Sequence, residues 1–209
     1  MKDERRPHGF DPERDVMLDA HNLRGLAHPL RLRMLGILRE SGPATATMLA
    51  NRLGESSAAT SYHLRQLAEY GFVVDDESRG KGRERWWRSA HRSSYFDATA
   101  DESEEARLLG ETYLRSVVGA LAARMEAWVD ALPTIPPLWR KGSGLSDYRA
   151  ALTPEEAARL VATLESIGTD LRDNRDRRPS DADARRVVFQ FQVLPDPRSV
   201  LDEEAPSDG

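Results

Sequence analysis

The stretch Ser57-Ala-Ala-Thr-Ser-Tyr-His-Leu-Arg-Gln-Leu-Ala-Glu-Tyr70, closed by Gly71, decides the fold of this chain. At 3.6 residues per turn, Thr60, Leu64 and Leu67 fall on one side and predict a helix with a buried face. The opposite side holds Ser57, Ala58, Ser61, Tyr62 and Arg65. Short side chains let a helix approach base edges closely, and a phenol and a guanidinium supply hydrogen-bond donors. The pattern predicts a DNA recognition helix.

The flanking segments supply the rest of a DNA-binding motif. A helical pattern covers residues 44–53, and a turn follows at 54–56. Downstream, an apolar strand at 72–74 is joined by the loop 75–82 to a second strand at 83–89. The order helix, turn, helix, hairpin is that of a winged helix-turn-helix domain.

Two sequence motifs resemble those of a known family. Residues 61–67 read Ser-Tyr-His-Leu-Arg-Gln-Leu and residues 71–73 read Gly-Phe-Val, and a leading helix at 23–35 has Pro29 at its centre. Over roughly residues 20–92 the chain resembles the ArsR family of bacterial transcriptional regulators. The resemblance implies a dimer that binds operator DNA. In metal-sensing relatives the first helix of the motif carries cysteine ligands, which are absent here.

The predicted hairpin has a basic tip. Arg79, Lys81, Arg83 and Arg85 surround Gly80 and Gly82. A glycine-rich, cationic wing can lie along the phosphate backbone or enter the minor groove. The alternative is a surface turn whose charges only interact with water. The acidic residues 75–77 lie at the base of the hairpin and the cations at its tip, which favours a role in DNA binding.

Charge distribution supports a nucleic-acid partner even though the whole chain has a net charge of −5. Residues 21–92 contain 12 Arg and Lys but only 7 Asp and Glu, so the acidic excess lies elsewhere. A cationic domain of this kind is what duplex binding requires. The 209 residues include no cysteine, which excludes disulfides and thiolate metal sites. The sequence has no apolar run long enough to span a membrane, and its charged first residues, 1–6, are not followed by the apolar region of a signal peptide. We therefore expect a cytoplasmic protein without a membrane partner.

A long helix is predicted over 101–132, after a polar linker at 93–102, with Asp101 as its N-cap. Apolar residues recur along this helix at alternating spacings of three and four, which forms a seam for a partner helix. The expected dimer interface consists of Leu114, Val118, Leu121, Met125 and Trp128.

The remaining segments complete the predicted organisation. Residues 1–14 are expected to be a disordered tail, and 15–92 the winged domain, whose first helix begins in 15–28. A strand-helix-strand unit is predicted at 145–195, with strands at 147–152 and 187–194. Its helix starts at Thr153-Pro154 with Glu156 in a capping box. Residues 196–209 are expected to be a second disordered tail.

The candidate chemical groups point away from catalysis. His63 lies near Ser61, but no third residue completes a triad, so packing or phosphate contact is the simpler role. His21 and His28 are seven residues apart without a third ligand, so no metal site is expected. Thr45 and Thr47 are expected to cap a helix or contact phosphate.

The sequence therefore predicts a mainly α protein with small β content: a winged helix-turn-helix domain, a long dimerisation helix and a small C-terminal unit. We expect no enzymatic activity and no cofactor. The expected function is that of a sequence-specific regulator, a repressor, that binds an inverted-repeat operator in double-stranded DNA as a homodimer. Two alternatives remain open. One is regulation by a small-molecule effector bound between the long helix and the C-terminal unit, near Trp128, Trp139 and Tyr148; the other is a winged helix used only for protein contacts.

Overall fold

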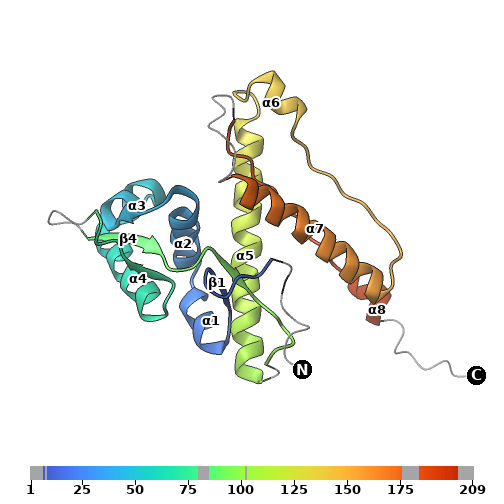
Figure 1. Ribbon diagram of the computed structural model, residues 1–209, viewed down its shortest axis with the longest axis horizontal. Coiled ribbons are helices and arrows are strands. Elements are labelled where there is room, and N and C mark those ends of the chain that lie inside the picture. Colours follow the sequence, from blue (N-terminus) through green and yellow to red (C-terminus); the bar gives the residue numbers. More distant parts are fainter. Residues whose placement is uncertain (1–6, 8, 80–84, 102, 176–183, 202–209) are drawn as a thin grey trace, which may run out of the picture. The chain divides into compact units, whose positions relative to one another are not determined.

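The computed structural model describes residues 7, 9–79, 85–101, 103–175 and 184–201 (Figure 1). The chain is mainly α with small β content, as predicted. It divides into two compact units, one spanning residues 11–145 and the other combining 1–10 with 146–209. Figure 1 shows the helix-rich larger unit, with a short sheet against the first helices and α5 as its longest element.

Helices dominate the larger unit because each one begins at a residue suited to that position. Asp19 caps the first helix, Thr45 the third and Ser56 the fourth, each through a side-chain oxygen that accepts a backbone N–H. Pro29 lies at the first turn of the second, where its missing N–H costs nothing. The helices are α1 (Ala20–Leu26), α2 (Pro29–Ser41), α3 (Ala46–Leu53), α4 (Ser57–Glu69), α5 (Glu104–Ala131) and α6 (Pro137–Lys141).

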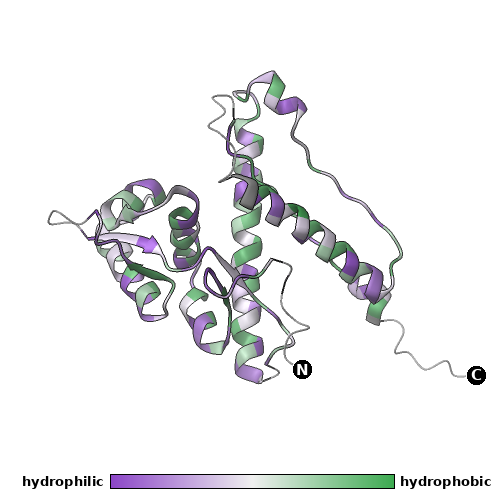
Figure 2. Cartoon of the chain, viewed as in Figure 1, coloured by the Kyte–Doolittle hydropathy of each residue, from purple (hydrophilic) through white to green (hydrophobic). Residues whose placement is uncertain are grey.

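A hydrophobic core joins helices α1 to α5 to the sheet, whereas α6 has no buried residue. The largest fully buried apolar side chains are Leu23, Leu26, Met34, Leu35, Leu49, Leu64 and Leu67 on the helices, together with Phe72 and Val73. Each such side chain contributes about 1.5 to 3 kcal/mol through burial. Hydrophobic residues alternate with polar ones along these helices, as the mixed colouring of Figure 2 shows. The core therefore holds the helix-turn-helix on a rigid support.

The wing is the outer part of an antiparallel sheet ordered β2-β4-β3. Its strands are β2 (Ala44–Thr45), β3 (Val73–Asp75) and β4 (Trp86–Ser89), with Val73 opposite Ser89. Trp87 is buried and the adjacent Trp86 is only half-buried, because successive side chains of a strand point to opposite faces of the sheet. Residues 80–84, the predicted tip, lie outside the described residues.

The start of the winged domain differs from the prediction. Residues 15–17 form strand β1 (Asp15–Met17) instead of the beginning of a helix, and the predicted linker contains strand β5 (Ser93–Tyr95). The two strands pair in parallel, with Asp15 opposite Ser93. Residues 12–14, predicted to be disordered, form a turn. Local periodicity could not reveal this, because each strand depends on a partner far away in the sequence.

Buried charges hold this parallel pair against α2. The Oδ2 atom of the buried Asp15 lies 2.8 Å from Nη2 of Arg92. Arg39 of α2 donates hydrogen bonds to the carbonyl oxygen of His91 (3.1 Å) and to Oγ of Ser94 (2.7 Å). Burial lowers the pKa of Arg39 to about 10, although nearby Tyr113 and Asp15 favour its charged form. The guanidinium thereby fixes the chain that leads from the wing into α5.

The helix α5 packs one stripe of its surface on the winged domain. This stripe contains Ala106, Gly110 and Tyr113, all buried against the unit's core. Salt bridges from Arg24 to Glu105 and from Arg124 to Glu40 (2.7 Å) flank it. The N-cap is Ser103 and not the predicted Asp101, which instead accepts a hydrogen bond from the backbone N–H of Ser103 at 2.9 Å.

The second unit contains α7 (Pro154–Arg175) and α8 (Pro197–Leu201). The predicted capping box is present: the N–H of Glu156 donates to Oγ1 of Thr153 at 3.2 Å, and the N–H of Thr153 donates to Oε2 of Glu156 at 2.8 Å. The predicted strands are wrong, since neither 147–152 nor 187–194, both described, forms one. Without a paired neighbour an alternating sequence gains no ladder of hydrogen bonds. The helix α8 lies within residues 196–209, which were expected to be a disordered tail. Residues 202–209 lie outside the described part.

No helix in the described part of the chain has the length and apolar character needed to cross a membrane.

Candidate nucleic-acid interface

The exposed face of α4 carries the predicted recognition residues. Ser57, Ala58, Tyr62 and Arg65 are exposed and Ser61 is half-buried, while Leu64 and Leu67 on the opposite face are inaccessible to solvent. Tyr62 has an exposed fraction of 51%, so its ring and hydroxyl are accessible to a ligand. The helix thus presents a polar, partly aromatic face with short side chains at its N-terminal end.

Thr60 fixes the position of α4 against α3. Its buried hydroxyl lies 2.9 Å from the carbonyl oxygen of Ala46 in the first turn of α3, and 3.2 Å from the carbonyl oxygens of Ser56 and Ser57. The sequence placed Thr60 on the core side of the helix but not in this contact between helices. A hydroxyl on an otherwise apolar face was the only available signal.

A surface hollow adjoins the recognition face where the start of α3, α4 and β4 meet. It has a volume of about 290 Å³ and is lined by Thr45, Ala46, Thr47, Ser61, Arg65, Arg85 and Trp87. The structure therefore brings together predicted residues from α4 and from the wing. Two guanidinium groups, Arg65 and Arg85, meet the first turn of α3 here. Cations and the N-terminal end of a helix both attract anions such as phosphate.

The two threonines predicted near this hollow have different environments. Oγ1 of the buried Thr45 accepts the N–H of Met48 at 3.3 Å, so Thr45 is the cap of α3. Thr47 is exposed at the rim of the hollow. Thr47 is therefore the one whose side chain can reach a ligand.

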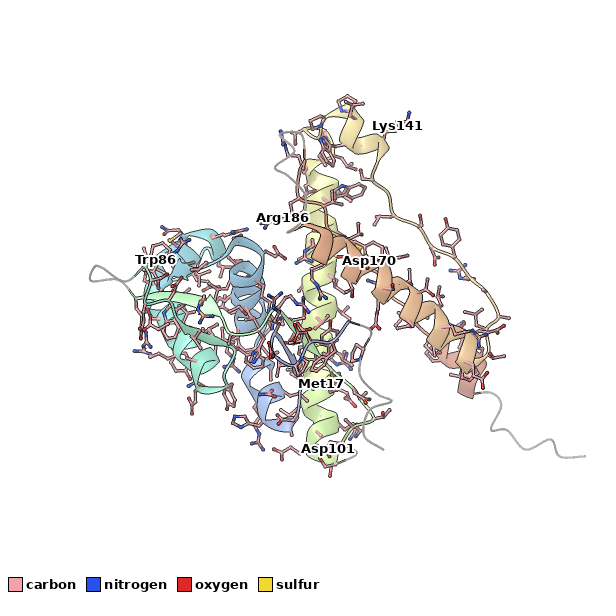
Figure 3. All side chains as sticks on the ribbon, in the orientation of Figure 1. Met17, Trp86, Asp101, Lys141, Asp170 and Arg186 are labelled. Carbon is pink, nitrogen blue, oxygen red and sulfur yellow. The ribbon has the colours of Figure 1, made fainter. Side chains whose placement is uncertain are left out.

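The base of the wing holds its arginines beside tryptophans and carboxylates. Arg79 lies 5.5 Å from the ring centroid of Trp86 and 3.8 Å from Asp76, and Figure 3 shows Trp86 at the end of β4 nearest the wing loop. Arg85 lies 4.1 Å from the ring of Trp87 and 2.5 Å from Oδ2 of Asp75. The pair of Arg85 and Asp75 is exposed on both sides, and exposed ion pairs are weak, so a phosphate can compete for the guanidinium of Arg85. Lys81 and Arg83, also predicted to bind DNA, lie outside the described residues.

Histidines form an unexpected pair beside the recognition helix. The rings of His28 and His63 lie 4.4 Å apart, and Tyr62 packs edge-on against His63 at 5.2 Å. Nδ1 of His63 is buried without a hydrogen-bond partner, and burial, followed by the neighbouring His28 and Arg31, lowers the pKa of His63. These ring contacts support the packing role considered for His63, and phosphate contact by this residue stays a prediction.

The pair His21 and His28, considered from the sequence, does not come together. Nδ1 of His28 accepts the N–H of Leu30 at 3.1 Å and caps α2, whereas His21 packs on Tyr70 at 5.0 Å. Within the residues that the structure describes, no group of three or more His, Asp or Glu side chains could hold a metal ion.

The predicted dimer seam lies on α5 beside the stripe that packs on the winged domain. Leu114 and Val118 are exposed, with fractions of 44% and 64%. Leu121, Met125 and Trp128 are half-buried. The seam and the core-facing stripe occupy adjacent parts of the helix surface, so a partner helix at the seam need not disturb the domain's core.

Comparison with known proteins identifies the central motif. Residues 26–75 match the family model of a helix-turn-helix domain, the type of domain with which transcription regulators bind DNA. The matched segment contains α3, the turn and α4 together with the start of the wing. None of the curated proteins compared with the chain matches it.

Two solved structures of a mutant ZitR from Lactococcus lactis resemble the chain. The match to the first, in the apo form, has 16% sequence identity and a TM-score of 0.30. It covers 69% of this chain and 83% of the ZitR chain. The match to the second has 17% sequence identity and a TM-score of 0.29, and it covers 69% of this chain and 75% of the ZitR chain. With scores this low, the fold assignment depends on the elements described above.

Proposed function

We propose that the chain is a transcriptional repressor of ArsR-like winged-helix type that binds an inverted-repeat operator as a homodimer. The observation that carries this proposal is the continuity between the exposed face of α4 and the hollow at Arg65 and Arg85. Base-reading and phosphate-binding groups then lie on one surface, which is the arrangement that a DNA-binding domain requires.

The mechanism follows from the side chains on this surface. With α4 in the major groove, Arg65 donates to guanine O6 and N7 or to a neighbouring base edge, and Tyr62 supplies a hydroxyl and an apolar ring. Ser57 and Ala58 keep the N-terminal end of the helix thin enough for close approach. Arg79, Arg85 and the cations of the wing tip contact phosphates and set the orientation.

Dimerisation through the seam on α5 would relate two copies of α4 by a twofold axis. The operator would then contain inverted half-sites about one helical turn, or a simple multiple of it, apart. The exposed apolar side chains of Leu114 and Val118 support this interface, since a second copy would remove them from water.

The decisive test is a comparison of specific and random DNA. An operator is selected from a pool of random duplexes with the full chain, and affinities are measured for the parent and for Arg65→Ala. We expect a loss of about 1 to 3 kcal/mol on the selected site and little change on random DNA, because Arg65 would read bases. Arg33→Ala, an exposed arginine on α2, is the matched control and should bind as the parent does.

Two outcomes would reject the proposal in different ways. An equal loss on both kinds of DNA would mean that Arg65 contacts only phosphates. Absence of any salt-dependent affinity for duplex DNA would favour the alternative in which the winged helix serves protein contacts, since phosphate binding releases counterions and depends on salt.

A further inference from the structure

One of the two arginines of the hollow beside the recognition face already forms an ion pair. Oδ2 of Asp75 lies 2.5 Å from Nε of Arg85, which lines the hollow. Asp75 ends β3 opposite Trp87 of β4, and the guanidinium of Arg85 lies 4.1 Å from the ring centroid of this tryptophan. Asp75 and Trp87 therefore hold Arg85 from two sides at the surface.

The other arginine of the hollow has a different environment. Arg65 of α4 is exposed, and none of the described carboxylates lies within ion-pair distance of its guanidinium. Arg85, in contrast, donates Nε–H, one of its five N–H donors, to Asp75. The hollow thus contains one arginine whose charge is available to a ligand and one whose charge a neighbouring carboxylate compensates.

The pair of Asp75 and Arg85 is one that DNA can break. The exposed fractions of the two side chains are 38% and 57%, so water screens their attraction. A phosphate offers two oxygens to the edge of a guanidinium, as a carboxylate does. Trp87 can stay in place during the exchange, because it contacts the face of the guanidinium and oxygens bind at its edge.

We propose that Asp75 is an internal competitor of DNA phosphate for Arg85 and thereby lowers the affinity of the wing for any duplex. The inference rests on the proposed DNA binding and deepens it by naming a residue that sets its strength. In the free protein the carboxylate occupies Nε of Arg85, and in the complex a phosphate replaces it. Carboxylate and phosphate repel each other, so binding of both to one guanidinium is unfavourable.

Two consequences distinguish this competitor from a residue that reads the sequence. Phosphates carry no sequence information, so Asp75 should weaken binding to the selected operator and to random DNA by the same factor. Salt screens exposed charges, so the difference that Asp75 makes should decrease as the salt concentration increases.

The inference is tested with Asp75→Asn in the full chain, by fluorescence anisotropy with the selected operator and with a random duplex. The substitution removes the charge and keeps an oxygen that can accept Nε–H of Arg85. We expect about two- to fivefold tighter binding to both duplexes at about 0.05 M salt, the range that an exposed ion pair provides. The gain should shrink towards about 0.3 M salt.

Two further variants separate competition for Arg85 from the general repulsion between a carboxylate and DNA. Glu77→Gln removes an exposed charge from the same hairpin and should increase the affinity less than Asp75→Asn does. In an Arg85→Ala background, Asp75→Asn should have no more effect than Glu77→Gln, because the guanidinium for which Asp75 competes is absent. The four chains with and without these changes at 75 and 85 form a double-mutant cycle.

The outcomes distinguish failure of this inference from failure of the proposed function. If Asp75→Asn binds no more tightly than Glu77→Gln, or gains as much in the Arg85→Ala background, Asp75 is not a competitor, although the parent still binds DNA. Weaker binding of Asp75→Asn would also overturn the inference, since Asp75 would then position Arg85 for the phosphate. A parent without salt-dependent affinity for duplex DNA would reject both proposals. Circular dichroism checks the fold, and Asp75→Ser is a second variant that removes the charge.

Discussion

At the scale of single residues, the hydroxyl of Thr60 on α4 forms a hydrogen bond that links this helix to α3. Thr60→Val keeps the shape of the side chain but removes the hydroxyl that donates to the carbonyl oxygen of Ala46 at 2.9 Å. We expect a loss of about 0.5 to 1.5 kcal/mol in the free energy of unfolding, the usual net contribution of one hydrogen bond. Urea denaturation measures it.

Thr112→Val is the matched control for Thr60→Val. The hydroxyl of Thr112 is exposed and donates to the carbonyl of Leu108 on its own helix, so its loss should change stability little. Equal effects of the two substitutions would show that the hydrogen bond between α3 and α4 contributes no more to the free energy of unfolding than an exposed one does.

A second residue-scale prediction concerns pH. Burial lowers the pKa of His63. The neighbouring His28 and Arg31 lower it further, whereas Glu55 raises it. The unfolded chain therefore takes up a proton near pH 6.5 that the folded chain resists. The free energy of unfolding should fall as the pH decreases from 7.5 through about 6.5 until the folded state also protonates.

His63→Gln should flatten this dependence, measured by urea denaturation at several pH values. Part of the dependence should remain, because burial, followed by Arg39, also lowers the pKa of His91. A variant with the full pH dependence of the parent would contradict the assignment to His63.

At the scale of elements, the wing and α4 should contribute to DNA binding in different ways. Replacing Arg79, Lys81 and Arg83 by alanine should weaken specific and random DNA alike, because these residues are proposed to contact phosphates. The slope of log affinity against log salt should flatten by up to about 0.9 for each lost contact. Arg115→Ala, an exposed cation on α5, is the control, and an unchanged slope in the wing variant would remove the wing from the interface.

At the scale of the whole molecule, dimerisation should depend on the seam of α5. Val118→Glu is a sharp probe because Val118 is 64% exposed, so the charge does not disturb the folded monomer. In a dimer the carboxylate would be buried without a partner, which drives the helices apart. We expect a folded monomer by sedimentation at concentrations where the parent is dimeric.

The matched control is Ala123→Glu, an exposed position on another side of α5. It should remain dimeric. If Val118→Glu also stays dimeric, the interface lies elsewhere, and the exposed apolar side chains of the second unit, such as Leu160 and Leu171, become the next candidates.

Local sequence patterns predicted α2, α3, α4 and α7 and the exposed face of α4, but they misplaced the starts of α1 and α5 and missed α8. Helical periodicity, capping residues and proline positions are local properties, so they can be interpreted without knowledge of the rest of the chain. The same local reasoning gave the capping box at Thr153.

Tertiary packing alone sets which distant groups meet. It pairs Asp15 with Ser93 and places His28 against His63. It also left 147–152 and 187–194 without the strand conformation that their sequences favour. A strand or a pocket exists only when a partner segment supplies hydrogen bonds or walls, and that partner is set by the packing of the whole core.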